Sequence, residues 1–387
     1  MTSQITFRES TPHEGHTTVA RVSVLFGGPS PEHDVSILTG LQACHVLSQA
    51  GHDVIPLYWA KTGDWHSVES GLEAAAFVNG VPRKSRQVVL SAGIERGFVE
   101  KRALGRVYSL GIDVAVNCCH GGPGEDGGLQ SALDLAGVKY TGPTARGAAL
   151  GMDKLAFGGI VTAAGLPTLP RVALLEKFLM PDFPAPWIVK PRFGGSSIGI
   201  YVVDDVETAR QLLASSPHLR SGAIVEPYLT GAVDLNISVR GYGAPALSEV
   251  ERPIREMKTK TDIYTYQDKY LGGEGLASAP RELPAALSAE VRGRLRDYAS
   301  TTAQLVQVRG VARIDFLLHE KKLWINEINT IPGAMSFYLW RASGVSHEVL
   351  LDDMLEEASK YPSYEPDVAG ADGLALGSAG AIASKLA

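Results

Sequence analysis

The pattern of apolar and polar positions at the start of the chain predicts a strand, a helix and a second strand. An apolar run at 21–26 ends in the turn Gly27-Gly28-Pro29-Ser30, a helical pattern follows from about 34 to 50, and another apolar run covers 53–59. This order forms a βαβ unit with a glycine turn at the carboxyl end of its first strand. Open α/β sheets bind ligands at this end, so we expect a ligand near the turn.

The rest of the chain continues as a mixture of strands and helices. Residues 111–138 repeat the first pattern, with a strand, a glycine-rich loop and a helix over 128–136. Beyond about 148 the strands come in pairs, which is typical of antiparallel sheets. We expect these strands at 187–190, 198–203, 223–226, 235–241 and 247–250, and helices at 154–164, 287–307 and 347–359.

Two alternating runs near the C-terminal end, 311–318 and 323–329, predict a β-hairpin because only a few polar residues separate them. If residues 320–322 form its loop, Asp315 faces Glu327 across the strand pair. Directly opposed carboxylates repel each other and destabilise a sheet. A divalent cation between them would remove that penalty, so this pair is a candidate metal site.

Two further polar groups share this face of the hairpin. By the same register Arg313 faces Asn329, and side chains two residues apart along a strand point the same way. Two carboxylates and an amide oxygen suit Mg²⁺ bound to nucleotide phosphates. The alternative is a solvated outer face of the sheet. The rigid turn 330–333, which follows the second strand, favours a site over a charged surface.

A glycine- and serine-rich loop follows the strand that ends at Lys190. Glycines in the segment 194–199 let the backbone approach phosphate oxygens, and successive N–H groups bind anions. The loop leads into a strand rather than a helix, so it is a flap and not a Walker A loop. Its alternative is an ordinary hairpin turn. Lys190, with its charge facing the loop, favours phosphate binding.

Three more positions are candidates for nucleotide contacts. Lys154 stands at the start of a predicted helix, although most lysines in such places are solvated. The segment 226–229 could join two domains and offer backbone hydrogen bonds to an adenine edge. Asp234 follows within reach of ribose hydroxyls, or is an ordinary surface aspartate.

Composition narrows the class of protein. A chain of 387 residues with 45% hydrophobic and 20% charged residues has room for two or three domains. Its net charge of −6 gives no footprint for nucleic acid, and no apolar run approaches the roughly 18 residues of a membrane span. The polar residues 1–18 do not resemble a secretory signal. Its three cysteines make no disulfide framework, so we expect a soluble, reduced, cytoplasmic protein.

The motifs together resemble the D-alanine–D-alanine ligases, a family of the ATP-grasp superfamily. The similarity extends from about 21 to 360 and implies an α/β (α+β) ATP-grasp fold with an amino-terminal Rossmann-like domain. The segments that carry it, in the order and with the spacing of the family, are 26–36, 120–130 with 152–154, 190–199, 264–270 and 313–333. The implied domains are an N-terminal tail at 1–20, the Rossmann-like domain at 21–142, the small ATP-grasp subdomain at 143–230, the large subdomain with metal and acceptor sites at 231–361, and a flexible C-terminal tail at 362–387.

The resemblance also implies roles for individual residues in binding ATP between the second and third domains. Two Mg²⁺ ions, for which Mn²⁺ can substitute, would be held by Asp315, Glu327 and Asn329. The ATP contacts would come from Lys154, Lys190 and Ser197 at the phosphates, Glu226 and Leu229 at the adenine, Asp234 at the ribose, and Lys269 at the γ-phosphate.

The chemistry of the family suits these residues. The donor carboxylate attacks the γ-phosphate to give an acyl phosphate, and the amine of the acceptor then displaces phosphate. Arg313 and the backbone N–H of Gly333 would stabilise the oxyanion of the tetrahedral intermediate. Glu32, linked to Ser196 and Tyr270, would bind the ammonium of the donor. The segment that carries Tyr270 would close over the site and exclude water.

The chain departs from the family pattern at four positions. Gly194 replaces an acidic residue of the flap, Pro227 a lysine of the adenine segment, and Gln267 a glutamate of the closing segment. Tyr338 stands where the family has a serine that binds the carboxylate of the acceptor. A tyrosine can donate a hydrogen bond too, but its bulk reshapes the subsite. The alternative is that Ser336, two residues earlier, takes the place of that serine.

Three functions remain open at this point. The first is ATP-dependent formation of a D-alanyl-D-alanine-type dipeptide for the cell wall. The second is a paralogous ligase with a different acceptor amine, in specialised peptide or antibiotic biosynthesis, and the third is a nucleotide-binding regulator without catalysis. Small amino acids are the expected partners, with no nucleic acid and no membrane, and the resemblance also allows a homodimer.

Overall fold

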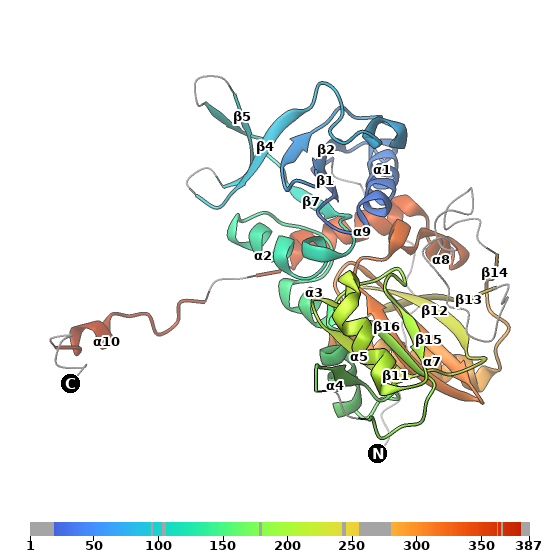
Figure 1. The fold of residues 1–387 in the computed structure, drawn as a ribbon. Helices are drawn as coiled ribbons and strands as arrows, with labels where there is room; N and C mark the ends of the chain where they lie inside the picture. The colour runs from blue at the N-terminus through green and yellow to red at the C-terminus, as the bar shows by residue number, and fades with distance from the viewer. Residues whose placement is uncertain are drawn as a thin grey trace, which may run out of the picture.

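Three β-sheets with helices packed on them make up the part of the chain that the structure describes (Figure 1). The computed structural model describes residues 19–93, 96–102, 106–177, 180–241, 245–254, 280–361, 363–364 and 367–380. No helix within these ranges is long and apolar enough to cross a bilayer. All three cysteines, Cys44, Cys118 and Cys119, are buried thiols that form no disulfide in the structure.

The amino-terminal sheet has a parallel core with β1 (Arg21–Gly27) at its centre. Strands β2 (Asp53–Trp59) and β7 (Val114–Asn117) pair with β1 on either side, and α1 (His33–Gln49) connects β1 to β2. The predicted βαβ unit is therefore confirmed. The sheet order is β6-β5-β4-β3-β2-β1-β7. The antiparallel extension, which the sequence pattern did not predict, consists of β3 (Trp65–Ser67), β4 (Arg86–Ser91), β5 (Gly97–Lys101) and β6 (Val107–Ser109), with the 3₁₀ turn η1 (Ala74–Phe77).

The last long helix, α9 (His347–Lys360), packs against this amino-terminal sheet (Figure 1). Its Leu350 and Leu351 share one buried cluster with Val22 and Phe26 of β1. The first strand and the last long helix therefore share a hydrophobic core. Neither segment carries a sequence signal for this contact, because each shows only that it has an apolar face.

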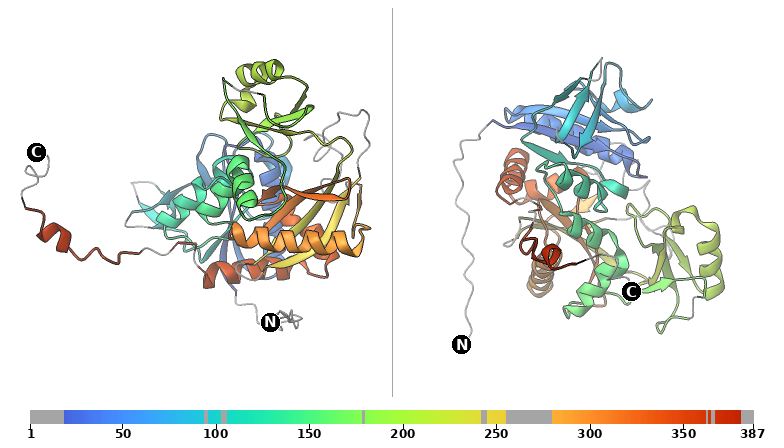
Figure 2. Two further views of the ribbon diagram at one scale, coloured as in Figure 1. Left: turned by 90° about the horizontal axis from the view of Figure 1, so that it is seen from below. Right: turned by 90° about the vertical axis from the view of Figure 1, so that its left-hand side faces the viewer.

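A small antiparallel sheet of order β10-β9-β11-β8 projects from the rest of the molecule, with α5 (Val206–Ser215) on its outer side (Figure 2). Its strands are β8 (Val172–Leu174), β9 (Trp187–Pro191), β10 (Tyr201–Val203) and β11 (Ala223–Pro227). The strand predicted at 198–203 begins only at Tyr201. Residues 196–199 form a turn instead, with positive φ at Ser196 (54°), Ser197 (58°) and Gly199 (73°).

The larger antiparallel sheet has the order β14-β13-β12-β15-β16, and α7 (Ala289–Leu305) packs on it. The segment 228–232 joins β11 of the small sheet to β12 of the large one, and the candidate adenine segment 226–229 overlaps this connection. The strands are β12 (Val233–Arg240), β13 (Ala246–Pro253), β14 (Arg281–Glu282), β15 (Val311–His319) and β16 (Lys322–Asn329).

The predicted register of the β15–β16 hairpin is confirmed at its site end, although its loop differs from the prediction. Asp315 pairs with Glu327 as predicted, but Lys322 already pairs with His319, so the loop is one residue shorter. Glu320 and Lys321 turn the chain with φ of 47° and 67°, which is typical of a two-residue hairpin turn. A bulge restores the register, because Phe316 pairs with Ile325 and leaves Asn326 as the extra residue.

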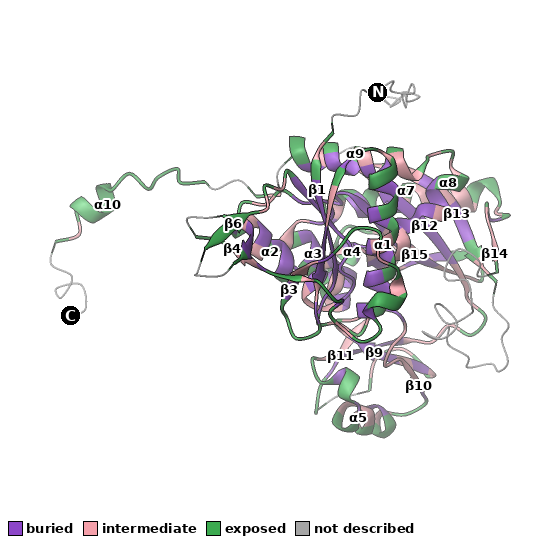
Figure 3. Ribbon diagram, turned by 90° about the horizontal axis from the view of Figure 1, so that it is seen from above, coloured by how far each residue is buried: buried purple, intermediate pink, exposed green. Residues whose placement is uncertain are grey.

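The remaining helices and turns lie between these strands or after the last of them. Buried residues, purple in Figure 3, lie mainly in the sheets and on the inner sides of the helices, while the outer side of α5 is exposed. The remaining elements are η3 (Gly122–Gly124), α2 (Gly128–Leu135), α3 (Ala145–Met152), α4 (Lys154–Ala163), η4 (Pro217–Leu219), η5 (Gly333–Ser336), α8 (Phe337–Ala342) and α10 (Leu374–Gly377). Residues 367–380, which include α10, extend away from the body (Figure 1).

Candidate active site

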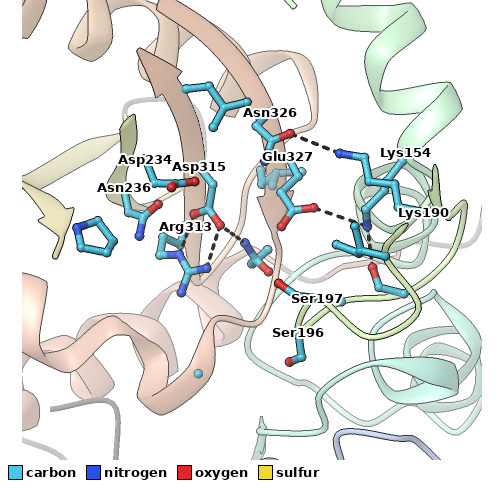
Figure 4. Close-up of a pocket in the computed structure, with 18 of the residues that line it drawn as sticks. Lys154, Lys190, Ser196, Ser197, Asp234, Asn236, Arg313, Asp315, Asn326 and Glu327 are labelled. Carbon is cyan, nitrogen blue, oxygen red and sulfur yellow. Dashed lines mark hydrogen bonds and ion pairs between the residues drawn. The ribbon is translucent and has the colours of Figure 1, made fainter. Parts of the chain in front are cut away.

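One pocket brings together every predicted site residue that the structure describes. It is lined by residues of the small sheet and the large sheet (Figure 4), and Glu32, which directly precedes α1, contributes at one end. Lys269 and Tyr270, with the rest of the closing segment 264–270, lie outside the described residues. The predicted residues that line the pocket are Glu32, Lys154, Lys190, Ser196, Ser197, Glu226, Leu229, Asp234, Arg313, Asp315, Glu327, Asn329 and Gly333.

The candidate metal face lies on the hairpin of β15 and β16. Arg313 donates to both oxygens of Asp315, from Nε at 2.6 Å and from Nη2 at 2.8 Å, and Asn329 donates to Asp315 Oδ2 at 3.1 Å. Lys154 Nζ lies 3.5 Å from Glu327 Oε2. The repulsion expected between the two opposed carboxylates is therefore relieved by these two cations (Figure 4).

The donor set of this face fits a divalent cation. Asp315, Glu327 and Asn329 offer two carboxylates and an amide on one side of the hairpin, and hard cations prefer such oxygen ligands. Nowhere in the described ranges do three Asp, Glu, His or Cys side chains gather as a metal site. An ion bound here would therefore need phosphate oxygens and water to complete its coordination, as Mg²⁺ does with nucleotides.

The flap is anchored at its base to the start of α4. Asp153 caps this helix by accepting from the backbone N–H groups of Leu155 and Ala156, and Arg192 donates to the same carboxylate from Nε at 2.7 Å. Lys154 donates from Nζ to the carbonyl of Gly194 at 2.5 Å. These contacts hold the ammonium of Lys154 directly beneath the glycine-rich turn, where the phosphates of a nucleotide are expected.

The second predicted lysine lies in a buried charge network. Lys190 Nζ is 2.6 Å from Glu226 Oε2 and donates to Asn326 Oδ1 at 3.3 Å. Burial lowers the pKa of the Lys190 ammonium, and the charge of Glu226 opposes that effect. The other oxygen of Glu226 lies 2.5 Å from Nε of Arg171. Sequence reasoning missed Arg171, because it stands in a proline-rich connection before β8 and carries no motif.

The predicted donor end of the pocket lies at the start of α1. Glu32 directly precedes this helix, and Ser196 of the flap donates a hydrogen bond from Oγ to Glu32 Oε1. The predicted link between these residues is therefore present. A Cβ on Gly121 would lie 2.6 Å from Glu32 Oε2, and a Cβ on Gly195 would lie 3.1 Å from it. The carboxylate thus sits in a cradle that two glycines keep narrow.

Glu125 ties the glycine-rich loop of the amino-terminal domain to the turn that follows β16. Its Oε2 accepts from the N–H of Gly121 at 2.9 Å, and its Oε1 accepts from the N–H of Ile331 at 2.9 Å and from Thr330 Oγ1 at 3.2 Å. Burial, with a smaller contribution from the charge of Glu32, raises the pKa of the Glu125 carboxyl to about 7. The position of the turn that carries Gly333 is therefore set by the amino-terminal domain.

Protonation of Glu125 should make stability depend on pH. Its folded pKa of about 7 lies above the ordinary value of 4.5, so the folded state binds the proton more tightly and stability falls as pH rises between these values. We expect the free energy of unfolding of the wild type, relative to that of Glu125→Gln, to fall by roughly 3 kcal/mol between pH 5 and pH 8. Urea unfolding of both proteins across this pH range measures the difference in their free energies of unfolding. A difference that does not change with pH would contradict the raised pKa of Glu125.

The predicted acceptor end of the pocket contains Tyr338 and not Ser336. Tyr338 lines the pocket, whereas Ser336 is 0% exposed and is not among the lining residues. The phenol donates to Glu251 Oε1 at 2.5 Å, and Asn236 donates to the same oxygen at 2.8 Å. Arg281 donates to Glu251 Oε2 at 3.1 Å, and its guanidinium lies 4.1 Å from the centre of the Tyr338 ring.

This arrangement changes what Tyr338 can offer an acceptor. A phenol can donate one hydrogen bond, and here Tyr338 donates it to Glu251. Burial, and then the charge of Glu251, raise the pKa of the Tyr338 phenol, so it stays protonated. In this arrangement the phenol proton is therefore not available to a substrate. The ring presents bulk to the acceptor end, and its oxygen can only accept.

Comparison with known proteins agrees with the motifs. Residues 21–143 match the family model of the D-ala D-ala ligase N-terminus, and residues 172–356 match that of the D-ala D-ala ligase C-terminus. The chain belongs to the D-alanine–D-alanine ligase family. As a member of this family it is an ATP-dependent ligase that joins a carboxylate to an amine in a dipeptide, and it requires a divalent metal.

Relatives of the family span nearly the whole chain. The D-alanine–D-alanine ligase of Chlorobaculum tepidum is 31% identical, over 86% of this chain and 95% of its own. That of Pelodictyon phaeoclathratiforme is 32% identical, over 87% of this chain and 97% of its own. The sequence similarity thus includes both the amino-terminal domain and the ATP-grasp part.

Solved structures of the family share the fold. The VanG D-Ala:D-Ser ligase of Enterococcus faecalis superposes with a TM-score of 0.71 at 24% identity, over 88% of this chain and 100% of its own. The D-alanine–D-alanine ligase of Coxiella burnetii gives 0.70 at 24% identity, over 88% of this chain and 94% of its own. The ATP-grasp fold is thereby confirmed.

Proposed function

We propose that the chain joins two molecules of D-alanine into D-alanyl-D-alanine for the peptidoglycan precursor, with ATP as the source of energy. One observation carries this proposal: a single pocket contains the Glu32–Ser196 pair, the lysines Lys154 and Lys190, and the carboxylates of the hairpin. An amine-binding group, a phosphate-binding group and a metal-binding face are what acyl phosphate formation requires. The names of the relatives in Chlorobaculum and Pelodictyon support the same substrate.

In this proposal the nucleotide binds along the pocket. The adenine would lie near Glu226 and Leu229, the ribose near Asp234, and the phosphates beside Lys154 and Lys190, all of which line the pocket. Two Mg²⁺ ions, or Mn²⁺ in their place, would be held by the hairpin carboxylates and would neutralise charge on the transferring phosphoryl group. The ammonium of the donor binds Glu32, which directs the carboxylate of the donor toward the phosphates.

Arg313 and Gly333 act in the second step, when the amine of the acceptor attacks the acyl phosphate. Burial alone would lower the pKa of the Arg313 guanidinium, but Asp315 outweighs burial and raises it well above its usual value. Arg313 therefore stays charged and stabilises the oxyanion of the tetrahedral intermediate, together with the N–H of Gly333. Its hydrogen bonds to Asp315 hold the guanidinium in place before the substrates arrive.

The test is ATP-dependent phosphate release by the purified protein with Mg²⁺, first with D-alanine alone and then with D-alanine paired with a panel of amines. Product masses identify the dipeptides. D-alanyl-D-alanine from D-alanine alone is the expected result. A protein that binds ATP but releases no phosphate with any amino acid would instead be the nucleotide-binding regulator.

The acceptor end supports a second candidate, a ligase that joins D-alanine to a different amine in specialised peptide or antibiotic biosynthesis. The supporting observation is that Tyr338 occupies the acceptor end with its only proton held by Glu251. A site built in this way offers no tyrosine hydroxyl to the carboxylate of the acceptor. Turnover that requires a second amine besides D-alanine would favour this candidate.

Replacing Tyr338 separates bulk from hydrogen bonding at the acceptor end. If the ring narrows the acceptor subsite, Tyr338→Ser should raise kcat/KM for D-alanine as acceptor, by about tenfold for a pocket contact of this size. The control Tyr338→Phe keeps the ring and removes the hydrogen bond to Glu251, so it should keep the acceptor preference of the wild type. Competition between D-alanine and larger amino acids measures the preference. An unchanged preference in Tyr338→Ser would remove this residue from acceptor selection.

The setting of the protein follows from its chemistry. We place it in the cytoplasm, because it uses ATP and because its three cysteines are buried thiols that form no disulfide. The homodimer that the resemblance allows is a prediction that the molecular mass in solution can test. The division into domains at 21–142, 143–230 and 231–361 is likewise a proposal, which limited proteolysis can examine.

A further inference from the structure

Arg171 is a buried cation behind the nucleotide pocket that no motif of the chain accounts for. Its side chain is 3% exposed, and it is not among the residues that line the pocket. It donates to the carbonyl of Lys154 at 2.8 Å and to the carbonyl of Asn326, and its Nε lies 2.5 Å from Glu226. One guanidinium therefore joins the start of α4, the bulge of β16 and the last part of β11.

The neighbouring helix α4 leaves space for this side chain. A Cβ on Gly158 would lie 2.7 Å from Cδ of Arg171 and 3.0 Å from its Nη1, too close for either atom to stay in place. The ring of Phe157 covers the guanidinium, with its centre 6.0 Å from Cζ. The small residue at 158 and the ring at 157 thus form a fitted space in which the position of Arg171 is fixed.

The charges around Glu226 are unbalanced in favour of cations. This carboxylate is 1% exposed and lies between two cations, Arg171 at 2.5 Å and Lys190 at 2.6 Å. A buried carboxylate is strongly destabilised when it loses its only cationic partner. With two partners, one can leave without that penalty. Arg171 is fixed by backbone carbonyls, whereas Lys190 has a flexible stem and lines the pocket, so Lys190 is the partner that can leave.

We propose that Arg171 is a positioning residue that keeps Glu226 neutralised and so releases Lys190 to bind the phosphates of the nucleotide. The planar guanidinium suits this task, because its nitrogens point in different directions and can hold a carboxylate and two carbonyls at once. A lysine at 171 would keep the charge but could not make all three contacts. The inference rests on the proposed function only in requiring ATP phosphates beside Lys190.

The first test is Arg171→Met, measured as the affinity for MgATP by calorimetry in the absence of amino acids. Without Arg171, Glu226 has only Lys190 as partner, and Lys190 cannot leave without stranding the carboxylate. We expect the Kd for MgATP and the KM for ATP to rise by about tenfold or more, while the KM for the donor amino acid stays within about twofold. Arg171→Lys should recover part of the lost affinity. An unchanged Kd in Arg171→Met would overturn the proposal.

The decisive comparison uses Glu226→Gln, which removes the charge that competes for Lys190 but keeps an acceptor oxygen. In this background Arg171→Met should change the Kd for MgATP by less than about threefold, because contacts that share a partner are not additive. Equal losses with and without the Glu226 carboxylate would overturn the proposal. If Arg171→Met alone does not fold, the double variant, which removes both charges, still provides the comparison with Glu226→Gln.

A buried arginine elsewhere supplies the control. Arg309 is also 3% exposed and donates to the carbonyls of Gly142 and Tyr361, away from the pocket. Arg309→Met should lower the melting temperature and leave the Kd for MgATP unchanged, which separates lost stability from lost positioning. Binding of MgATP without formation of dipeptide would reject the proposed function alone, because the calorimetric comparison needs no turnover.

Discussion

Glu327→Gln and Asp315→Asn should each lower kcat by about 10²–10³-fold while the protein stays folded. A metal ion that polarises phosphoryl oxygens lowers the activation barrier by several kcal/mol. Each 1.36 kcal/mol of that barrier changes the rate by a factor of ten. An amide keeps the shape of the ligand but removes its negative charge, so the ion binds weakly and in the wrong place. Phosphate release at increasing Mg²⁺ concentrations measures the effect, and both variants should need more Mg²⁺ than the wild type for half-maximal rate.

Glu327→Gln is the cleaner of the two variants. The side chain of Glu327 is 24% exposed and lies 3.5 Å from Lys154 Nζ, and a glutamine at this position keeps an oxygen that can accept from the ammonium. Asp315→Asn also weakens the two hydrogen bonds that hold Arg313. A matched control is Glu249→Gln on β13, which pairs with Arg292 at 3.3 Å outside the pocket and should keep normal turnover. Near wild-type phosphate release by both Glu327→Gln and Asp315→Asn would refute the metal assignment.

The hairpin shows how far a sequence pattern can reach. Alternation along two strands was enough to place Asp315 opposite Glu327, and the structure confirms that pairing. The pattern did not show that the turn is one residue shorter or that a bulge at Asn326 compensates for it. Whether a strand forms a bulge depends on the residues that it packs against in the folded protein. The bulge at Asn326 affects the site, because both Asn326 and its neighbour Glu327 line the pocket.

The residues that the sequence did not reveal act through partners far along the chain. Arg171 gains its role from Glu226 and Asn326, which lie 55 and 155 residues away. Glu125 contacts the turn at Ile331 across 206 residues. Local spacing identifies groups that share a strand or a loop, such as Lys190 and its flap. It cannot identify a buried partner whose only signal is a cavity built by a distant segment.

At the acceptor end, one feature could be predicted from the sequence and another could not. Its position after Gly333 was readable from the order of the motifs, and the structure places Tyr338 in the pocket as that order predicts. The partner of the Tyr338 hydroxyl could not be predicted from the sequence. Glu251 belongs to β13 and contacts the phenol only because α8 packs on that strand. Substrate preference is therefore the property that sequence predicts least well in this protein.

Arg313→Lys should lower kcat by about 10²–10³-fold, the usual loss on removing an oxyanion donor, with little change in the KM for ATP. Two nitrogens of the guanidinium, Nε and Nη2, are already bound to Asp315, which leaves Nη1 to meet the oxyanion. A lysine has one ammonium and must choose between Asp315 and the substrate. The positive charge at position 313 is therefore kept, and only the simultaneous contact with Asp315 and the oxyanion is lost.

This result would separate the two steps of the reaction. Arg313→Lys should keep the Mg²⁺ dependence of the wild type, because the hairpin carboxylates are intact, whereas Glu327→Gln should not. Arg292→Lys, which changes an arginine that binds Glu249 outside the pocket, should behave as the wild type. If Arg313→Lys kept more than about a third of the wild-type kcat, a guanidinium that contacts Asp315 and the oxyanion at the same time would not be needed. The N–H of Gly333, fixed by the turn that Glu125 holds, would then be the remaining donor for that charge.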